Sequence, residues 1–366
     1  MYELLSQLSV EFDSIVIIVL AAFAGGAFGA AIGALPAFCL TGVVVIAGEA
    51  ADSIHPSSHS EILLVLSSPV TGDIGFGPIL GPHVAFAGGA AAAAFAAKYH
   101  SSPTVLVDGD YHPAKNIARA LGPMPSVMFV GGLFGIFGAL GIRFLMYVQV
   151  PWDPLNTMVV LSAILHRFVF NYPIVRLPRG LTGSFDMSPF ADGVKSSYSI
   201  NYAGSSTRTE FSWNRYLIEP WLPHQYEWSS VTMIGLVAGL LGGYVALITN
   251  SPFLAFGISA ASLTFLALGI EKIPVTHHIT LPASTATIAV LNDPTGTSQL
   301  IALVTGGVFG IIGALFGEFA QRIFYAHSDT HLDPPAVSIV FTTFLISIFA
   351  ALGIFHDAAW LTVVSI

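Results

Sequence analysis

The stretch Gly131-Gly132-Leu133-Phe134-Gly135-Ile136-Phe137-Gly138-Ala139-Leu140 recurs later in the chain as Gly306-Gly307-Val308-Phe309-Gly310-Ile311-Ile312-Gly313-Ala314-Leu315. Helices in lipid gain no hydrophobic energy by associating, so they depend on small residues that let them pack closely. An apolar, glycine-rich segment of this kind predicts a packed membrane helix. Its recurrence predicts that the chain consists of two related halves.

Three further pairs of segments occur in the same order around these two copies. They are Asp153-Pro154 with Asp333-Pro334, His83-Val84-Ala85-Phe86 with His278-Ile279-Thr280-Leu281, and Gly25-Gly26 before Leu35-Pro36 with Gly242-Gly243 before Ser251-Pro252. Chance similarity between small-residue helices would account for one such pair. Four pairs in the same order favour a duplication.

The composition is typical of a membrane protein. Of the 366 residues, 54% are hydrophobic and only 9% are charged, whereas a soluble domain carries about 25% charged residues. The mean hydropathy is +0.77, and so few charges cannot cover a soluble surface of this size. The single cysteine, Cys39, excludes an intramolecular disulfide framework and a multi-cysteine metal site. Residues 1–13 contain no Lys or Arg, so we interpret the first apolar run as a retained span rather than a signal peptide.

Apolar runs predict five membrane elements in each half, with a polar segment between the halves. The runs are 14–34, 37–51, 76–98, 124–149 and 154–172, and then 229–250, 252–271, 276–292, 299–325 and 335–355. We expect 37–51, 76–98 and 276–292, which are short or interrupted by Pro and Gly, to be broken or re-entrant. A topology with fewer crossings is the alternative. The predicted organisation is a first membrane repeat at 1–172, a polar linker or cap at 173–228 and a second membrane repeat at 229–366.

The distribution of basic residues favours an inverted relation between the halves. Five crossings per half would place the second half upside down relative to the first. One side then holds Lys98, Lys115, Arg119, Arg176, Arg179, Lys195, Arg208, Arg215, Lys272 and Arg322, with Arg167 near it and only Arg143 opposite. The positive-inside rule makes the crowded side, which includes the linker, cytoplasmic. Inverted repeats are typical of secondary transporters, whose sites lie near the midplane at discontinuous helices.

Matching breaks in the two halves indicate a first candidate binding site. Gly33-Ala34-Leu35-Pro36 and Thr249-Asn250-Ser251-Pro252 interrupt apolar runs at corresponding places. A Pro in the first turn of a helix leaves neighbouring N–H groups free, and the helix dipole there favours anions. If the two ends face each other, Pro36 and Pro252, with Asn250 and Ser251 beside them, would bind a carboxylate. The alternative is that both are plain turns between spans.

Histidine and hydroxyl side chains indicate further binding residues. His83 follows Gly81-Pro82, and His277-His278 precede Pro282-Ala283-Ser284-Thr285. These side chains can donate hydrogen bonds to an anion, so we interpret His83, His278, Ser284 and Thr285 as the polar lining of the site. For His277 we expect a solvated turn. A shared metal ion is disfavoured because adjacent histidines in a helix point about 100° apart.

Glu318 lies alone inside the predicted span 299–325. An ionisable group at membrane depth is a candidate for coupling to H⁺ or Na⁺. The alternative, which we favour, is an i,i+4 ion pair with Arg322 near the helix end.

The sequence carries no enzyme signature: it has no P-loop, haem-attachment motif or Rossmann fingerprint. Asp108, Asp110 and His112 form only a weak metal-ligand pattern in a polar loop. We therefore expect neither an enzyme nor a bound cofactor.

One loop resembles a known family. The segment Asp108-Gly109-Asp110-Tyr111-His112-Pro113-Ala114-Lys115-Asn116-Ile117-Ala118-Arg119-Ala120-Leu121-Gly122 is similar to the "DGYP-AK-G-A--ALG" loop in the large membrane subunit of tripartite tricarboxylate transporters. Further similarities are Gly33-Ala34-Leu35-Pro36 with a "G-LPG" break, Gly88-Gly89 before Pro103 with a "YGGS…PG" hairpin, and Leu281-Pro282-Ala283-Ser284-Thr285-Ala286-Thr287 with "GIPGSATTA". Ala37, Ala90 and Ala283 stand where the family has Gly, Ser and Gly. The resemblance implies an elevator-like transporter of organic anions that works with a small membrane subunit and an extracytoplasmic binding protein.

These observations predict an all-α polytopic membrane protein that acts as a secondary transporter of a small, carboxylate-containing anion. We expect ion coupling, a homo-oligomer and the plasma membrane of a prokaryote. The alternative is a non-transporting scaffold or assembly subunit of an oligomeric complex. Opposed half-helices around a polar cavity would favour transport, and a solid apolar centre would favour the scaffold.

Overall fold

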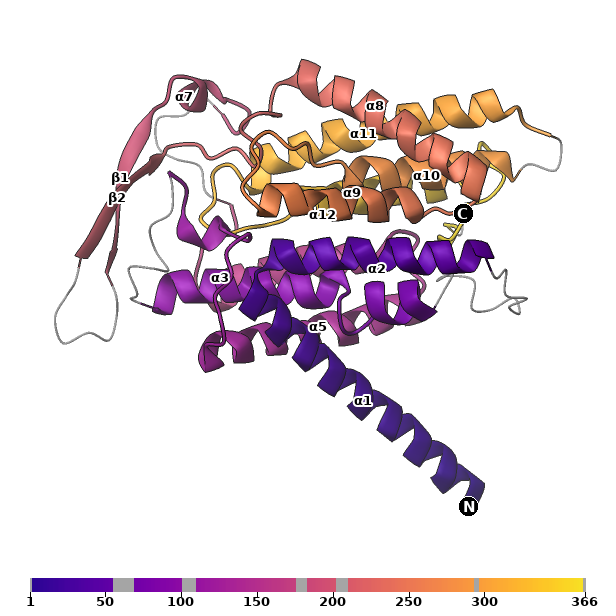
Figure 1. Ribbon diagram of the computed structural model, residues 1–366, viewed down its shortest axis with the longest axis horizontal. Helices are drawn as coiled ribbons and strands as arrows, with labels where there is room; N and C mark the ends of the chain where they lie inside the picture. Colours follow the sequence, from indigo (N-terminus) through magenta and orange to yellow (C-terminus); the bar gives the residue numbers. More distant parts are fainter. Residues whose placement is uncertain are drawn as a thin grey trace.

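The protein is a bundle of long helices that run roughly along its longest dimension (Figure 1). The computed structural model describes residues 2–54, 69–100, 110–175, 183–201, 210–292 and 296–364. Within these ranges, six helices are long and apolar enough to cross a membrane. They are α1 (Tyr2–Ile32), α2 (Ala34–Ile54), α5 (Pro125–Tyr147), α8 (Trp228–Thr249), α11 (Gln299–Phe324) and α12 (Pro334–Ala351). The multi-pass helical membrane protein expected from composition is thus confirmed.

Four shorter helices complete the bundle. They are α3 (Ala87–Tyr99), α6 (Pro154–Val169), α9 (Leu254–Ala267) and α10 (His277–Leu291). The predicted run 76–98 is interrupted as expected: a π-helical turn, η1 (Val70–Gly75), is followed by non-helical residues and then by η2 (Pro82–Phe86), which continues into α3. The predicted run 276–292 is the short helix α10, which contains Pro282.

The expectation that 37–51 is broken or re-entrant is wrong. This run lies inside α2, which is continuous from Ala34 to Ile54. The break precedes it at Gly33, whose φ of +97° lets the chain turn from α1 into α2. Pro36 lies in the first turn of α2, where its missing N–H removes no intrahelical bond.

The polar segment between the halves forms a small hairpin at one end of the bundle. It contains α7 (Ser188–Ala191) and the antiparallel strands β1 (Lys195–Asn201) and β2 (Glu210–Tyr216). The short helix η3 (Pro113–Lys115) packs nearby, and the Tyr216 N–H donates to the Asp110 carbonyl. We call this end of the bundle the hairpin end and the opposite end, where the chain finishes, the C-terminal end (Figure 1). Arg176, Arg179 and Arg208 lie outside the described residues.

The recurring glycine motif brings helices together at backbone distance in both halves. A Cβ atom on Gly135 of α5 would lie 2.3 Å from the Ala22 carbonyl oxygen of α1. A Cβ on Gly310 of α11 would lie 2.4 Å from the Gly235 carbonyl oxygen of α8. Neither position has room for a side chain, so these glycines set the α1–α5 and α8–α11 contacts.

One predicted pairing of glycines is displaced by a helical turn. We expected Gly25-Gly26 to correspond to Gly242-Gly243, but Gly26 meets Gly131 and Gly135 whereas it is Gly239 that meets Gly306 and Gly310. The sequence alone does not separate these options because small residues recur at three- and four-residue intervals on the same helix face.

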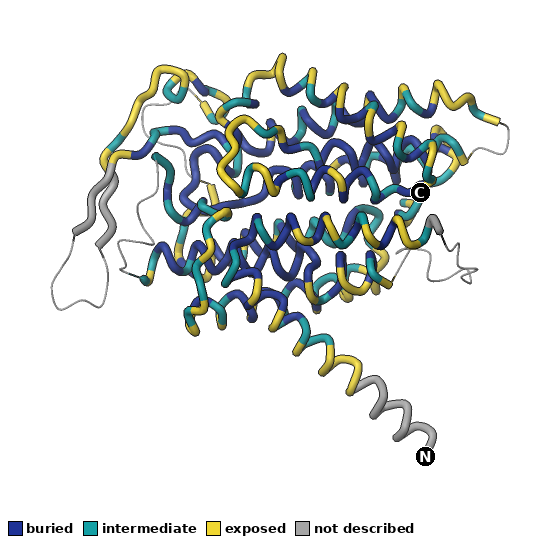
Figure 2. Tube along the Cα trace, viewed as in Figure 1, coloured by how far each residue is buried: buried dark blue, intermediate teal, exposed yellow. Residues whose placement is uncertain are grey.

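The buried residues lie along the long axis of the bundle. Figure 2 shows buried residues along the middle of the bundle and exposed residues on its outer helices. Large apolar side chains such as Phe129, Leu241 and Leu300 are more than half exposed. An apolar exterior of this kind is what contact with lipid requires.

Candidate functional site

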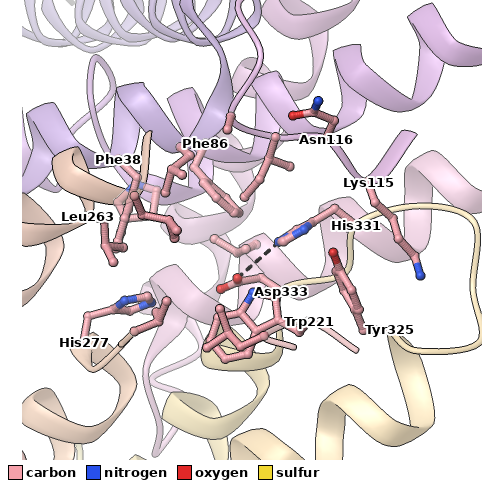
Figure 3. A pocket seen from close by; sticks show the side chains of 18 of the residues that line it. Phe38, Phe86, Lys115, Asn116, Trp221, Leu263, His277, Tyr325, His331 and Asp333 are labelled. Carbon is pink, nitrogen blue, oxygen red and sulfur yellow. Dashed lines mark hydrogen bonds and ion pairs between the residues drawn. The ribbon is translucent and has the colours of Figure 1, made fainter. Parts of the chain in front are cut away.

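A cavity of about 710 Å³ lies between the two halves, toward the hairpin end. Its wall combines α2, η2 and α6 of the first half with α9, α10 and the segment before α12 of the second. Aromatic rings dominate this wall. Figure 3 shows Phe38 and Phe86 on one side and Trp221 on the other, with Tyr325 beside them.

Three polar side chains point into the middle of this cavity: His277, His331 and Asp333 (Figure 3). The His331 Nε2 atom lies 3.3 Å from Asp333 Oδ1, and Asp333 Oδ2 accepts a hydrogen bond of 3.0 Å from the Ala336 N–H. Asp333 is therefore the N-cap of α12 as well as a partner of His331. The Nδ1 atoms of His277 and His331 are buried and have no hydrogen-bond partner.

The rings hold the two histidines in place. His277 is the first residue of α10 and packs against Phe38, with ring centroids 4.7 Å apart, and against Phe256 at 5.9 Å. His331 packs edge-on against Phe86 at 5.6 Å and Tyr325 at 5.2 Å. Phe38 also contacts Phe86 at 5.8 Å. The cavity is therefore bounded by one continuous set of aromatic contacts that joins the two halves.

A buried ion-pair network fixes the hairpin side of the cavity. The Lys115 Nζ atom lies 2.7 Å from Glu219 Oε2, and Arg215 bridges Glu219 at 2.5 Å and Asp329 at 2.7 Å. Burial lowers the pKa of Lys115 to about 8, with the negative charge of Glu219 opposing the shift. The Lys115 ammonium group points away from the middle of the cavity (Figure 3). Its charge thus serves the network rather than the cavity.

A second cavity, of about 310 Å³, lies toward the C-terminal end. Trp152, Asp153 and Trp360 line it, and Asp153 accepts bonds of 2.9 Å from both the backbone and the side-chain amide of Asn156. Asn156 and Pro82 line both cavities. The two cavities therefore approach the same two residues from opposite ends of the bundle.

The two predicted helix breaks do not face each other, which corrects that expectation. The helices α2 and α9 pack side by side in opposite directions: a Cβ on Gly42 would lie 2.3 Å from the Ala261 nitrogen, and one on Gly257 would lie 2.9 Å from Val45. Antiparallel packing puts the two N-termini at opposite ends. Pro36 is thus at the hairpin end and Pro252 is at the C-terminal end.

The residues beside Pro252 have structural partners. The Ser251 hydroxyl accepts bonds from the Phe253 and Leu254 N–H groups, which caps α9, and donates to the buried Glu49 carboxylate. Thr71 donates to the same carboxylate at 2.9 Å. Asn250 is exposed and ends α8 in a left-handed conformation with a φ of 53°.

The other predicted lining residues are buried in helix contacts. The His83 carbonyl packs on Gly138, and the His278 carbonyl on Gly313, where an added Cβ would lie 1.8 Å and 2.7 Å away. The Ser284 hydroxyl donates to the Gly242 carbonyl, and Thr285 accepts a bond from the Trp360 indole. None of these four residues is among those lining either cavity.

His277 was expected in a solvated turn, and that expectation is wrong, because only 6% of it is exposed and it lines the larger cavity.

Glu318 forms the ion pair that we favoured over a coupling role. Its Oε1 atom accepts a 2.6 Å bond from Arg322 Nε and a 2.9 Å bond from Gln321. Arg322 also donates to the carbonyls of Phe185 and Tyr226. Glu318 thus helps to fasten the linker to the end of α11.

Asp110 and His112, the described residues of the weak metal-ligand pattern, have structural roles. Asp110 pairs with Lys195 at 2.7 Å, and His112 caps η3 by accepting a bond from Ala114. Asp108, Gly109 and Pro103 lie outside the described residues. Within the described part of the chain, no group of three or more His, Cys, Asp or Glu side chains is arranged to hold a metal ion.

Sequence reasoning missed the residues that give the larger cavity its polar character. Asp333 was noted only as part of a repeated Asp-Pro pair, and His331 and Asn156 were not considered. A usable signal was present: an Asp before Pro at the start of a predicted helix is an N-cap, and His331 precedes Asp333 by two residues.

Comparison with known proteins places the chain in a family without identifying a relative of known activity. No curated protein and no solved structure matches it, so the resemblance to the large subunit of tripartite tricarboxylate transporters stays a prediction. A family model matches residues 7–364, which is nearly the whole chain. The chain therefore belongs to a family of unknown function, DUF7973.

Proposed function

We propose that this protein is a secondary transporter that carries a small organic anion with a carboxylate group across a membrane. The observation that carries the proposal is the pair of cavities that reach Pro82 and Asn156 from opposite ends of the bundle. A carrier must expose one binding site to each side in turn, and two cavities separated by a thin barrier at shared residues suit that requirement. A scaffold subunit would need no such cavities.

The helices at the centre support an anion as the solute. The helix α10 begins at His277 on the wall of the larger cavity, and η2 begins at Pro82, which lines both cavities. The first N–H groups of a helix have no partner within it, and the positive end of the dipole lies there. Discontinuous helices with their N-termini at the middle of the membrane are a common way to bind a substrate carboxylate.

An inverted relation between the halves is part of the proposal. Its support is the similar packing of α1 with α5 and of α8 with α11, together with chain direction. The helix α8 starts at the hairpin end, whereas α1 finishes there (Figure 1). The elevator-like movement, ion coupling, oligomer, prokaryotic plasma membrane and partner subunits remain predictions.

Cysteine accessibility tests the two-sided site directly. Cys39, the only cysteine, is buried and is first replaced by alanine. Single cysteines then replace Asn156, Trp221 of the larger cavity and Trp152 of the smaller one. An impermeant maleimide is applied to right-side-out and to inverted membrane vesicles. We expect Trp221→Cys to react from one side, Trp152→Cys from the other and Asn156→Cys from both.

Uptake into proteoliposomes tests transport itself. Asn156→Leu should abolish accumulation of a transported carboxylate, whereas Val304→Ala, on the exposed face of α11, should leave it unchanged. The proposal fails if no carboxylate of a broad panel accumulates and Asn156→Cys reacts from one side only.

A further inference from the structure

The larger cavity has walls that suit a flat apolar body. Phe38 and Phe86 lie on one side and Trp221 on the other (Figure 3), and aliphatic side chains, among them Leu263 and Leu266, line the rest of the cavity. Aromatic rings stack on or meet the edges of other rings with a preference for offset or perpendicular geometry. The volume of about 710 Å³ falls in the range of small-molecule sites.

The charges on this wall limit how many negative charges a ligand can bring. Among the described lining residues, the lysines are Lys115 and Lys272, no arginine is present, and the remaining basic side chains are the histidines His224, His277 and His331. Lys115 is held by Glu219 at 2.7 Å and points away from the cavity, and Lys272 is exposed beside Glu271. Away from Lys272, at the exposed edge, a second or third carboxylate inside the cavity would lose its hydration without gaining a counter-charge.

One place in the cavity suits a single carboxylate. The N-terminus of α10 offers free N–H groups and the positive end of its dipole. Independently of the helix end, the His277 side chain is 94% buried, given its exposed fraction of 6%, points into the cavity and has an Nδ1 atom without a partner. A buried polar atom of this kind is costly unless something bonds to it.

Asp333 is an acidic side chain on the cavity wall, and its contacts fix where its charge lies. Its carboxylate is already bonded by the Ala336 N–H and faces His331, and its charge lies at the N-terminus of α12, where the helix dipole stabilises it. Asp333 keeps its negative charge, and these contacts hold that charge at the start of α12 rather than at the first turn of α10.

We infer that the larger cavity binds an organic anion with one carboxylate and a flat apolar body, such as an arylacetate, in preference to a di- or tricarboxylate. The inference rests on the proposed function for the choice of an anion, and it deepens that function by naming the class. The carboxylate lies at His277 and the first turn of α10, and the ring lies between Trp221 and Phe38.

Equilibrium binding to the purified full-length protein in detergent tests this class. The probes are phenylacetate, citrate and phenethylamine, each titrated calorimetrically. We expect phenylacetate to bind at least tenfold more tightly than the other two. Trp221→Ala should weaken phenylacetate binding by about fivefold, and Phe144→Ala, an exposed aromatic position that lines neither cavity, should leave it unchanged. Phe38→Leu provides a second variant of the same wall that keeps an apolar side chain.

Each contrary result has a distinct meaning. Tighter binding of citrate, or equal effects of Trp221→Ala and Phe144→Ala, would overturn the inference. Tighter binding of phenethylamine would indicate an organic-cation site and would overturn both the inference and the anion proposal. Binding of phenylacetate without uptake into proteoliposomes would leave the inference standing while transport fails. Uptake of citrate without binding of phenylacetate would support transport and overturn the inference.

Discussion

The α1–α5 and α8–α11 helix pairs make similar backbone contacts through glycine but differ in their polar side chains. Gly135 and Gly310 bring α5 against α1 and α11 against α8, and in both pairs an added Cβ would collide with a carbonyl oxygen. Five residues after Gly138 the first half has Arg143, which is exposed, whereas five residues after Gly313 the second half has Glu318, which is buried. Close packing thus constrains the glycines in both halves and leaves the polar positions free to differ.

The helix caps show the same contrast. Asp153 and Asp333 each precede a Pro and cap α6 and α12. Asp153 faces the amide of Asn156 in the smaller cavity, whereas Asp333 faces His331 in the larger one. Both aspartates cap a helix. Their side-chain partners differ, Asn156 for Asp153 and His331 for Asp333, and this difference gives each cavity its own chemistry.

The largest expected effect tests the shared glycine packing. Gly138→Ala places a Cβ 1.8 Å from the His83 carbonyl oxygen, and Gly313→Ala places one 2.7 Å from that of His278. Overpacking costs about 1–3 kcal/mol and sometimes more, so we expect Gly138→Ala to lose most of its folded yield and Gly313→Ala to lose less. Fluorescence-detected size exclusion and thermal unfolding measure both.

Gly183→Ala is the control for this pair, because nothing lies within 4 Å of a Cβ there. Equal and small effects at Gly138 and Gly313 would mean that α5 and α11 can move away from their neighbours, and the comparison between halves would lose its packing basis.

Most membrane helices were predictable from the sequence because apolar runs of sufficient length have few alternatives in lipid. The faces that helices present were not. His277 and His278 are adjacent, and only the contact of His278 with Gly313 and Gly317 turns His277 toward the cavity. The rotation of α10 about its axis depends on contacts with residues far along the chain. The spacing of apolar residues within α10 therefore does not predict it.

The position of the helix breaks was predictable, but their relation in space was not. Gly33 and Pro36 in the first segment and Pro252 in the second mark turns correctly. Whether two turns meet depends on the relative direction of α2 and α9, which pack along their length through Gly42 and Gly257. The aromatic cavity was missed for the same reason, since Phe38, Trp221 and Tyr325 come from three separate parts of the chain.

A second, smaller effect separates Glu318 from Arg143, each of which lies five residues after a glycine of the recurring motif. Glu318→Gln removes the charge that holds Arg322 at 2.6 Å, and breaking a buried pair by removing one partner costs about 3–5 kcal/mol. Because Arg322 keeps its bonds to two carbonyls, we expect a loss of only about 2 kcal/mol. Arg143→Gln, on an exposed position, should change stability by less than about 0.5 kcal/mol.

Denaturant unfolding in detergent, followed by tryptophan fluorescence, measures the two changes. If Glu318→Gln is as stable as the unmodified protein but abolishes ion dependence of uptake, Glu318 is a coupling residue and the structural interpretation is wrong.

The two caps should lose stability by similar, smaller amounts. Asp153→Ala and Asp333→Ala each remove an N-cap oxygen that accepts a bond of about 3 Å, which costs about 1 kcal/mol. Asn is an equally good N-cap, so Asp153→Asn and Asp333→Asn should both recover this loss in thermal unfolding. Failure of Asn to restore stability at 333 alone would show that the charge facing His331 matters beyond capping, and would sharpen the difference between the cavities.

The last expected effect is a slope of stability with pH rather than a fixed loss, and it belongs to the larger cavity alone. Burial lowers the pKa of Lys115 from 10.5 to about 8. Between those two values the unfolded chain binds more protons than the folded protein at this site, so stability should rise with pH across the window. Lys115→Met lacks this contribution. The stability of the unmodified protein relative to Lys115→Met should therefore increase from pH 8 to pH 10, by at most about 1.4 kcal/mol per pH unit.

Lys195→Met is the matched control for this measurement. Lys195 also pairs with a carboxylate, Asp110 at 2.7 Å, but it is exposed, and the hydrogen bond to Asp110 raises its pKa. Its titration in the folded protein therefore lies above the window, and the control should show no rise in relative stability between pH 8 and pH 10. A flat difference for Lys115→Met as well would mean that the attraction of Glu219 outweighs burial and keeps Lys115 charged. The wall of the larger cavity would then carry a fixed charge, and its contrast with the smaller cavity would rest on His331 and His277.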